Sequence, residues 1–432
     1  MSPQINPALP QIMWLDLNSA FATTEQQAYP GLRHRPVGVT NRTSPNCCVI
    51  TASYEAKAQG IHTGMRRIEA LRQCPGLILV ESHPAKYSAV YRRLFRIMHS
   101  YSPDCDMKSI DEGYIDLKST GYDTPAKLIR LGQELKDRVK QEIGEYLTIN
   151  VGLGSNRFLA KLAAGLHKPD GLDMITADNL VQVYSQLRLE DLTGIAEHLG
   201  CRLRRAGINT PVQFLEASET TLRRQVFHGI TSTYWYQRLR GYEVDDQPTG
   251  LSMIGRQWVV DHGSDDEDYL SSCLHCLAEN VGLKLRYRRI KARGVCVRLR
   301  LQAGGHYQRK VLSPGPFDSD QAIWQLAEPL FQARPAGRIC RLGIYVYNFQ
   351  STNQDQLSLL SQTTRSASLV KAIDRINQTY GLATIHSAHS SLGFKHVRQK
   401  VPFGSTKYFD PYPPIQKLTL MVKNRHYLWT IL

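Results

Sequence analysis

The sequence has few of the features that mark exported or membrane-spanning chains. It contains no run of roughly 18 apolar residues, the length that a membrane-spanning helix requires. Residues 1–10 lack a basic segment followed by an apolar one, so no signal peptide is expected. The nine cysteines are scattered, as in a chain whose thiols stay reduced. We therefore expect a cytoplasmic protein that is not embedded in a membrane.

A structural zinc site is also not expected. Cys273 and Cys276 have the spacing of a ligand pair, but zinc needs a second pair, and none follows at a suitable distance. The segment around them, LSSCLHCLAENVGLKLR, predicts a helix in which both cysteines are core or boundary residues.

Acidic residues are outnumbered. The chain has 53 Lys and Arg against 38 Asp and Glu, a formal net charge of +15. Such an excess is typical of a protein with a polyanionic partner. Because no long basic amphipathic helix is present to bind a membrane surface, the charge favours nucleic acid. The alternative is a basic surface that is simply solvated.

Short strands and helices alternate through the first 172 residues, which predicts an α+β layer. The apolar and polar periodicity gives the following segments. Strands are expected within 11–18, 36–57, 109–117 and 148–153, and helices at 84–99, 125–144 and 156–166.

The second half separates into a helical part and a second α+β part. Residues 173–245 are predicted to be mostly helical, and 244–250 to form a linker. Residues 251–349 follow a β-α-β-β-α-β order. Strands are expected at 254–260, 294–301, 307–313 and 339–347, and helices at 267–288 and 318–333. A polar connector is expected at 350–365, followed by a segment with one helix at 367–380.

The densest acidic cluster of the first half is DCDMKSIDEGYID, residues 104–116. It could be a solvated hairpin edge. It could also be a site for a hard cation, because adjacent carboxylates repel one another unless a metal offsets their charge. Gly113 is expected to lie near a bend that lets Asp111 and Glu112 approach one ion. Asp16 ends a separate apolar strand, and acids from different strand ends suit two-metal phosphoryl transfer.

Four segments resemble the motifs of Y-family DNA polymerases, in the family's order. They are WLDLNSAFATTE at 14–25, TASYEAKAQGIHTGM at 51–65, SIDEGYIDL at 109–117 and VGLGSNRFLAKLAAGLHKPDGL at 151–172. With the block at 251–349, which resembles a little finger domain, the likeness is greatest to the bacterial DinB/UmuC group. An alternative hypothesis is that the chain is an unrelated basic nucleic-acid-binding module, but this would leave the four motifs unexplained.

The resemblance implies a right-hand polymerase. It implies a palm at 1–25 and 80–172, fingers at 26–79, a thumb at 173–245, a little finger at 251–349, a connector at 350–365 and a C-terminal module at 366–432. The implied enzyme is a DNA-directed DNA polymerase that performs low-fidelity translesion synthesis. The alternative is a catalytically weak or inactive adaptor that binds DNA and the sliding clamp, but the chain keeps all three acids.

The resemblance also implies the roles of the acids. Asp16, Asp111 and Glu112 are the expected catalytic and metal-binding residues, with the backbone carbonyl of Leu17 as a further ligand. The expected cofactor is a pair of Mg²⁺ ions, for which Mn²⁺ can substitute. Asn18 stands where a second aspartate is common in the family, which predicts weaker metal binding.

The incoming nucleotide is expected to meet one set of side chains. The set consists of Ser19, Ala20, Phe21, Thr51, Tyr54, Lys57 and Lys168. Phe21 matches the steric gate that excludes ribonucleotides, and its alternative role is that of a core aromatic residue. Lys57 replaces the family's arginine and so loses the bidentate fork. The segment 48–50 is expected to form the roof over the nascent base pair.

Contacts to DNA are expected from the thumb and the little finger. Residues 191–215 resemble a helix-hairpin-helix, with Ala196 in place of the second glycine. The basic block 284–300 is expected to place a strand edge and a helix end along the duplex, and its alternative role is that of a solvated helix face.

A short segment of the connector resembles the pentapeptide that binds the bacterial sliding clamp. Its expected contact residues are Gln356, Leu357, Leu359 and Leu360. The implied partners are primer-template DNA, dNTPs, the clamp and SOS-type accessory proteins, which places the protein at the nucleoid.

Overall fold

The computed structural model describes residues 4–42, 44, 47–246, 250–351, 363–381 and 383–397. The described residues form two compact units, one before residue 248 and one after residue 249. The clamp-like pentapeptide at 356–360 and residues 398–432 lie outside the described residues.

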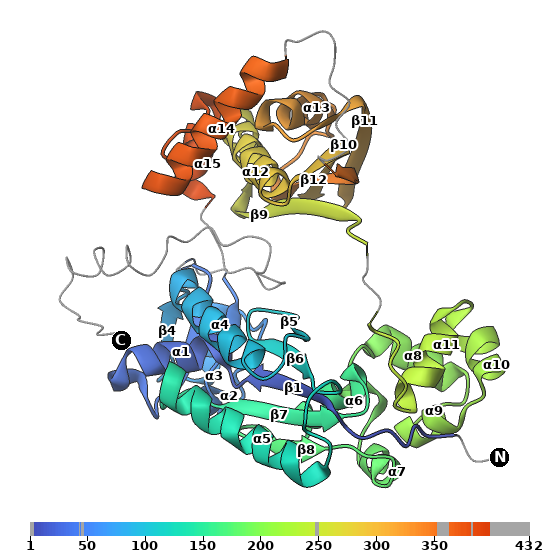
Figure 1. The fold of residues 1–432 in the computed structure, drawn as a ribbon. Helices are drawn as coiled ribbons and strands as arrows, with labels where there is room; N and C mark the ends of the chain where they lie inside the picture. The colour runs from blue at the N-terminus through green and yellow to red at the C-terminus, as the bar shows by residue number, and fades with distance from the viewer. Residues whose placement is uncertain are drawn as a thin grey trace. The chain divides into compact units, whose positions relative to one another are not determined.

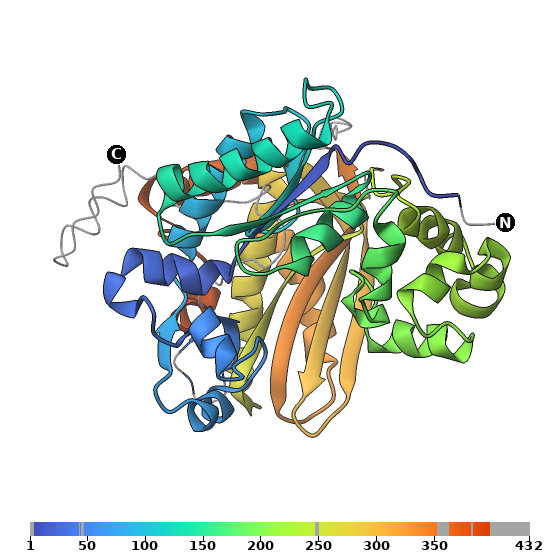
Figure 2. The same ribbon diagram turned by 90° about the horizontal axis from the view of Figure 1, so that it is seen from below.

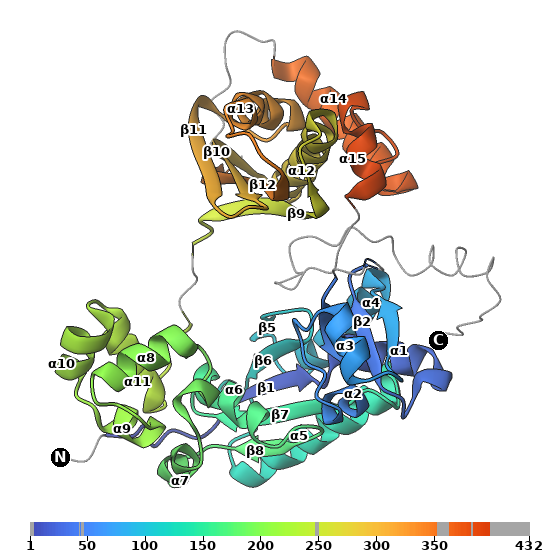
Figure 3. The same ribbon diagram turned by 180° about the vertical axis from the view of Figure 1, so that it is seen from behind.

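A five-stranded sheet organises the first unit. Its order is β5-β6-β1-β7-β8, so β1 lies at its centre (Figures 1 and 3). The strands are β1 (Ile12–Leu17), β5 (Cys105–Met107), β6 (Glu112–Asp116), β7 (Ile149–Gly154) and β8 (Leu172–Met174). β1 pairs antiparallel with both β6 and β7. Segments that are far apart in sequence therefore meet at the two ends of β1.

The two faces of this sheet are covered differently. Alternate residues of a strand point to opposite faces, and Met13, Leu15 and Leu17 belong to the core that the sheet shares with two long helices. These helices are α4 (Pro84–His99) and α5 (Pro125–Arg138), the latter continued by a π-helical turn at Val139–Ile143. Ile12 and Trp14 pack on the other face. Asp16 shares the face of Ile12 and Trp14.

Helix α6 (Arg157–Leu166) covers the Trp14 side of the sheet at close range. A Cβ atom at Gly152 of β7 would lie 2.1 Å from the carbonyl oxygen of Ala160 and 2.1 Å from the backbone nitrogen of Ala164. Only glycine allows this approach of helix and strand. The position of α6 against the sheet is thus fixed by backbone contact.

Gly113 does not lie at a bend, contrary to expectation. It is inside β6, where it pairs with Leu15 of β1 and Met107 of β5. A Cβ atom there would lie 2.7 Å from the carbonyl oxygen of Asp106. The glycine is required by close packing within the sheet, and the chain turns before it, at Ser109–Asp111.

A smaller sheet of order β3-β2-β4 forms the predicted fingers region. Its strands are β2 (Val37–Thr40), β3 (Val49–Ala52) and β4 (Ile78–Glu81). Helix α1 (Ala20–Ala28) and a short 3-10 turn at Pro30–Leu32 lead into this region, whose helices are α2 (Tyr54–Ala58) and α3 (Arg67–Gln73). Ser53 caps α2 by accepting a hydrogen bond from the backbone of Ala56. The strands expected within 36–57 are confirmed as β2 and β3.

The predicted thumb is helical, as expected, and its helices, drawn in green, gather in a separate cluster (Figure 2). They are α7 (Leu180–Ser185), α8 (Glu197–Arg205), α9 (Pro211–Glu216), α10 (Glu219–Thr221) and α11 (Thr231–Leu239), with short turns at Leu189–Asp191 and Leu222–Phe227.

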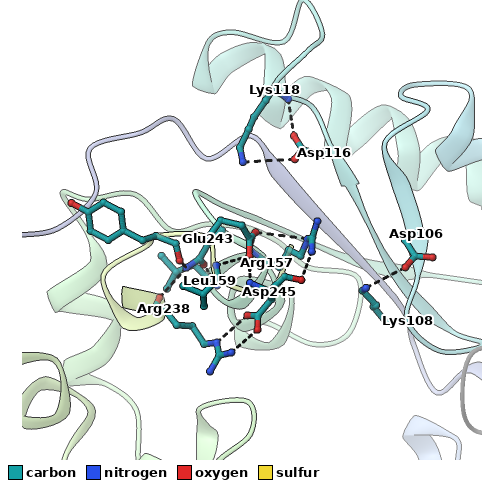
Figure 4. Close-up of polar contacts among 12 residues, drawn as sticks. Asp106, Lys108, Asp116, Lys118, Arg157, Leu159, Arg238, Glu243 and Asp245 are labelled. Atoms are coloured by element: carbon teal, nitrogen blue, oxygen red, sulfur yellow. Dashed lines mark hydrogen bonds and ion pairs between the residues drawn. The ribbon is translucent and has the colours of Figure 1, made fainter. Parts of the chain in front are cut away.

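A polar network joins the start of α6 to the chain that follows α11 (Figure 4). The backbone nitrogen of Arg157 donates to Glu243 over 3.0 Å. Arg238 forms a two-bond ion pair with Asp245, at 2.9 and 2.5 Å. The side chain of Asn156 caps α6 and also donates to the carbonyls of residues 238 and 242. These bonds fix the helices of the predicted thumb to the five-stranded sheet through α6.

The second unit has the predicted β-α-β-β-α-β order. Its elements are β9 (Met253–Ser264), α12 (Glu267–Tyr287), β10 (Ile290–Leu301), β11 (His306–Phe317), α13 (Asp320–Gln332) and β12 (Ile339–Ser351). The sheet order is β11-β10-β12-β9. β12 extends to Ser351 and the next helix begins at Thr363, so the described ends of the predicted connector 350–365 are ordered elements.

One expectation for the basic block 284–300, the strand edge, is wrong. β10 pairs with strands on both sides and is not an edge. Lys284 is half-buried and donates to the carbonyl of Gly255, and desolvation lowers the pKa of its ammonium to about 8. Arg286 is bound to Asp320 and Asp374. Part of this block therefore forms contacts within the second unit, with partners far away in the sequence.

The C-terminal elements pack on α12 (Figures 1 and 3). They are α14 (Thr363–Tyr380), a 3-10 turn at Ala388–Ser390 and α15 (Ser391–His396). Glu279 of α12 accepts hydrogen bonds from the backbone of Ser387 and the hydroxyl of Ser390. The backbone nitrogen of Gly393 donates to Ser272 over 2.8 Å. Residues 387–396 thus belong structurally with the second unit.

Candidate active site

The three predicted acids lie at the ends of neighbouring strands. Asp16 is opposite Glu112 in the β1–β6 pairing. The backbone nitrogen of Leu17 donates to the carbonyl oxygen of Asp111 over 2.9 Å, which holds the chain before β6 against the end of β1. The sheet therefore brings together acids that are about a hundred residues apart in sequence.

The electrostatics of the acids show that they are crowded. Burial raises the pKa of Asp16, the cation of Lys168 opposes this shift, and Glu112 and Asp111 add to it. Burial also raises the pKa of Asp111, against a 2.5 Å hydrogen bond from Ser109 and with repulsion from Glu112. Carboxylates in such surroundings gain from a nearby cation.

Glu112 is held by two donors that the sequence did not suggest. The ammonium of Lys161, on α6, lies 2.8 Å from its carboxylate. The indole nitrogen of Trp14 donates to Oε2 over 3.2 Å. Lys161 also lies over the Trp14 ring, 4.9 Å from its centroid. Because both donors come from closely packed elements, the direction of the Glu112 side chain is fixed.

Two predicted triphosphate-binding lysines lie beside the acids. Lys168 is 2.8 Å from Oδ2 of Asp16. Lys57 donates to the hydroxyl of Ser19 over 2.8 Å and lies over the ring of Tyr54. Desolvation and the charge of Lys168 lower the pKa of Lys57, against the effect of Asp16. The region therefore contains cations next to carboxylates, as a site for a metal–triphosphate complex requires.

Asn18 does not point freely toward the acids. It is buried, and its amide donates to the side-chain oxygen of Asn150 over 2.7 Å. Its oxygen accepts hydrogen bonds from Thr148 and from the backbone of Asp170, both at 2.9 Å. Asn18 therefore holds the loop that carries Lys168, and this structural role was missed from the sequence.

The remaining predicted nucleotide contacts lie on the elements next to the acids. Ser19 has a left-handed backbone (φ 49°) at the start of α1, followed by Ala20 and Phe21. The ring of Phe21 is almost fully buried and stacks on Tyr87. Thr51 lies in β3, opposite Val39 of β2. In the predicted roof, Cys48 is exposed and Val49 is buried.

The donor set fits a hard divalent cation, since three carboxylates and a backbone carbonyl are the oxygen ligands that Mg²⁺ prefers. Two of the acids, Asp16 and Glu112, contact lysines. Within the described part of the chain, no group of three or more His, Cys, Asp or Glu side chains is assembled around one point.

Lys161 is the residue that a motif could have revealed. It closes the Asn-Arg-Phe-Leu-Ala-Lys segment at 156–161, which resembles the family's palm motif. Trp14 offered no such signal, because its contact with Glu112 depends on the register of two strands. In the residues that the structure describes, no helix is long and apolar enough to cross a membrane.

Comparison with known proteins gives a consistent result. The model of the impB/mucB/samB family matches residues 15–165, and the model of that family's C-terminal domain matches residues 253–359. DNA polymerase IV of Moorella thermoacetica is 30% identical over 392 residues, which cover 88% of this chain and 96% of the relative. DNA polymerase IV 1 of Bacillus subtilis is 27% identical and covers 87% of this chain and 91% of the relative.

Solved structures resemble the fold. A Y-family DNA polymerase chimera built on Dbh matches with a TM-score of 0.67 at 21% identity, over 79% of this chain and 99% of the chimera. DinB from Sulfolobus solfataricus matches with a TM-score of 0.53, also at 21% identity, over 78% of this chain and 98% of its own. The fold is that of the Y-family polymerases, with α+β palm and little finger parts as expected.

The chain belongs to the impB/mucB/samB family of Y-family polymerases. Within the Y family it is of the DinB type, as the DNA polymerase IV relatives indicate. The resemblance of the four sequence motifs to this family is thereby confirmed.

Proposed function

We propose that this DNA-directed DNA polymerase of the translesion class extends a primer by two-metal nucleotidyl transfer at Asp16, Asp111 and Glu112. The observation that carries the proposal is the meeting of these acids at the ends of β1 and β6, with Lys168 and Lys57 beside them. The proposed ions are Mg²⁺, held by the three carboxylates and the carbonyl of Leu17.

Each group of the site has a part in the reaction. When bound, the metal ions supply acidification of the primer 3′-hydroxyl and neutralisation of the triphosphate charge. Lys57, Lys168 and the hydroxyl of Tyr54 bind the triphosphate. Lys168 exchanges its contact with Asp16 for a phosphate contact, which releases the Asp16 carboxylate for a cation. Lys161 and Trp14 keep the carboxylate of Glu112 in place.

Nucleotide selection is assigned to the start of α1 and to the fingers. Phe21 is the proposed steric gate, with the backbone of Ser19 and Ala20 beside the sugar. Thr51 lies at the triphosphate, and residues 48–50 form the roof over the nascent base pair. The exposed Cys48 offers little bulk to a distorted template. This composition supports tolerance of damaged bases.

The proposed grip on DNA involves both units. In the thumb, the N-cap residue of α8 is Ala196, whose side chain makes no capping bond, so backbone N–H groups there remain for phosphate. In the second unit, one face of the sheet carries no helix, and we call it the helix-free face. Its basic and aromatic side chains are Arg298, Arg300, Lys310, Arg341, Tyr345 and Tyr347. Such a face suits a duplex backbone.

The test of the polymerase site is primer extension by the purified full chain with Mg²⁺ and dNTPs. Asp111→Ala combined with Glu112→Ala should abolish extension while leaving DNA binding and the melting temperature near those of the wild type. Lys127→Ala, at an exposed ion pair on α5, serves as the matched control and should extend normally. Equal extension by the double variant would overturn the assignment.

The clamp contact is proposed from sequence alone. Gln356, Leu357, Leu359 and Leu360 would anchor the chain on the bacterial sliding clamp, whose pocket takes apolar side chains. Binding to purified clamp should fall at least tenfold in Leu357→Ala combined with Leu360→Ala. Unchanged affinity would remove the pentapeptide as the anchor. SOS-type accessory proteins remain proposed partners.

A further inference from the structure

Tyr87 touches two residues of α1 that lie one helical turn apart. Its ring stacks on Phe21, with centroids 4.4 Å apart and an angle of 21° between the planes. Its hydroxyl donates to Oε1 of Glu25 over 2.8 Å. Residues i and i+4 share a helix face, so Tyr87 of α4 lies across Phe21 and Glu25 together. One side chain thereby joins the proposed gate to a buried carboxylate.

Glu25 is an unusual anchor, because its side chain has no solvent exposure. Lys86 lies 2.6 Å from one carboxylate oxygen, and Nδ1 of His83 lies 3.1 Å from the other. Burial raises the pKa of Glu25, but the bonds to His83 and Lys86 outweigh it and hold the pKa below its ordinary value. The carboxylate is therefore charged, and it accepts the Tyr87 hydrogen bond as an ion.

The Tyr87 hydroxyl remains a donor in this setting. Tyr87 is 2% exposed, and burial together with the charge of Glu25 raises the pKa of its phenol far above the ordinary value. The neutral phenol is fixed at both ends, by the ring stack and by the bond to Glu25. Its ring therefore has little freedom to move away from Phe21.

A steric gate depends on the rigidity of its side chain. A phenyl ring that can change rotamer would move aside for a 2′-hydroxyl, whereas a ring backed by a second fixed ring cannot do so without losing the stack. Nothing in the proposed chemistry uses Tyr87 or Glu25 directly. Their arrangement has a clear use if the position of Phe21 must be kept within narrow limits.

We propose that Tyr87, held by Glu25, is a positioning residue that fixes the ring of Phe21 and so sets how strongly ribonucleotides are rejected. This inference rests on the proposed steric-gate role of Phe21. It assigns part of the sugar specificity to α4, a helix that supplies none of the proposed nucleotide contacts.

The experiment measures kcat/KM for dNTP and rNTP insertion by the full chain, and takes their ratio as the readout. Tyr87→Leu removes the ring and the hydroxyl, and should lower discrimination against rNTPs by up to about tenfold, the effect that one aromatic stack can supply. Tyr87→Phe keeps the ring and loses only the bond to Glu25, and should give a smaller reduction of roughly twofold. It also serves if Tyr87→Leu fails to fold.

The matched control is Met98→Ala. Met98 is fully buried on the same helix, three turns from Tyr87 and roughly 16 Å away along its axis. It should lower the melting temperature while the dNTP/rNTP ratio stays at the wild-type value. This separates loss of stability from loss of gate position.

Phe21→Ala distinguishes failure of the steric-gate proposal for Phe21 from failure of the positioning role of Tyr87. If Phe21→Ala raises ribonucleotide insertion while Tyr87→Leu and Tyr87→Phe leave the ratio unchanged, the gate stands and the positioning role of Tyr87 is overturned. If Phe21→Ala itself leaves the ratio unchanged, the gate proposal fails and this inference fails with it. A graded loss in the order Tyr87→Phe, Tyr87→Leu, Phe21→Ala supports both.

Discussion

Asn18 illustrates how one position can have a role that its family pattern does not suggest. As a substitute for an aspartate it predicted weaker metal binding. In the fold its amide joins the end of β1 to Asn150 and to the backbone of Asp170. Asn150 in turn donates to the carbonyl of His167. The network therefore supports the loop that carries Lys168, and an amide is needed because one end must donate and the other accept.

Restoring the aspartate should therefore cost stability. In Asn18→Asp the new carboxylate faces the side-chain oxygen of Asn150, which cannot turn without losing its bond to His167. We expect the free energy of unfolding to fall by about 1–3 kcal/mol, the usual effect of a buried polar group left without its partner. Urea denaturation without Mg²⁺ measures this. Asn209→Asp, at an exposed position, is the control, and equal stability of both variants would contradict the role given to Asn18.

The acids themselves should destabilise the metal-free protein. The pKa of Asp111 is raised by burial and by Glu112, so the folded state holds this proton more tightly than the unfolded state. Its charged form therefore lowers stability above the raised pKa, and this effect is relieved as the pH falls through that value. Asp111→Asn should stabilise the metal-free chain at pH 8 by about 0.5–2 kcal/mol.

The same variant gives the sign of the pH dependence. The difference between Asp111→Asn and wild type should shrink as the pH falls and vanish below the unfolded value of 3.8. Saturating Mg²⁺ should reverse it at pH 8, because an ion bound only by the folded wild type stabilises that protein. Urea midpoints at several pH values, with and without Mg²⁺, provide the measurement. A difference that grows on acidification would contradict the assignment of burial as the cause.

For single residues, the sequence predicts a functional role where the residue stands in a motif, and misses the role where it depends on a tertiary contact. Asp16, Asp111 and Glu112 stand in recognisable segments, and the structure brings them together. Trp14 and Tyr87 act through partners 98 and 62 residues away. No local pattern carries that information, because it depends on strand register and on the packing of one helix against another.

The positions of strands and helices along the chain agree closely with the periodicity of apolar residues, whereas the order of strands within a sheet could not be predicted from it. Helix α4 begins and ends at the predicted residues 84 and 99. The position of β10 inside its sheet could not be read from its own residues, since an edge strand and a central strand can have similar alternation. The strand position of Gly113 was missed for the same reason, because its cause is a contact with Asp106 on the neighbouring strand.

The contact between α6 and β7 predicts the effect of a single methyl group. In Gly152→Ala, the new Cβ would meet the backbone of Ala160 and Ala164 at 2.1 Å, so the helix must move. We expect a loss of about 1–3 kcal/mol in stability, and reduced extension activity because Lys161 of α6 holds Glu112. Urea unfolding and primer extension test both effects.

Gly165→Ala is the matched control on the same helix. A Cβ atom at Gly165 would meet nothing within 4 Å, and alanine favours a helix by about 1 kcal/mol over glycine. This variant should be at least as stable as the wild type and fully active. If both substitutions behaved alike, the close approach of α6 to the sheet would not be the cause.

Considered over the whole molecule, not every basic residue behind the net charge of +15 can contact DNA. Lys284 and Arg286 are used in the interior of the second unit. The helix-free face instead carries Arg298, Arg300 and Arg341, two of which are exposed. Composition therefore predicted the kind of partner, whereas the fold was needed to tell the structural cations from those that can reach a phosphate.

The salt dependence of DNA binding tests this distinction. If the helix-free face contacts the duplex, the logarithm of the affinity falls linearly with the logarithm of the salt concentration, and each lost phosphate contact reduces the slope by about 1. Arg298→Ala, Arg300→Ala and Arg341→Ala together should reduce the slope by about 3, as measured by fluorescence anisotropy with primer-template DNA between 50 and 200 mM salt. Lys127→Ala, at an exposed position of α5, should leave the slope unchanged. An unchanged slope in the triple variant would place the phosphate contacts elsewhere, whereas a weaker affinity with an unchanged slope would mean that these arginines act through the fold of the sheet.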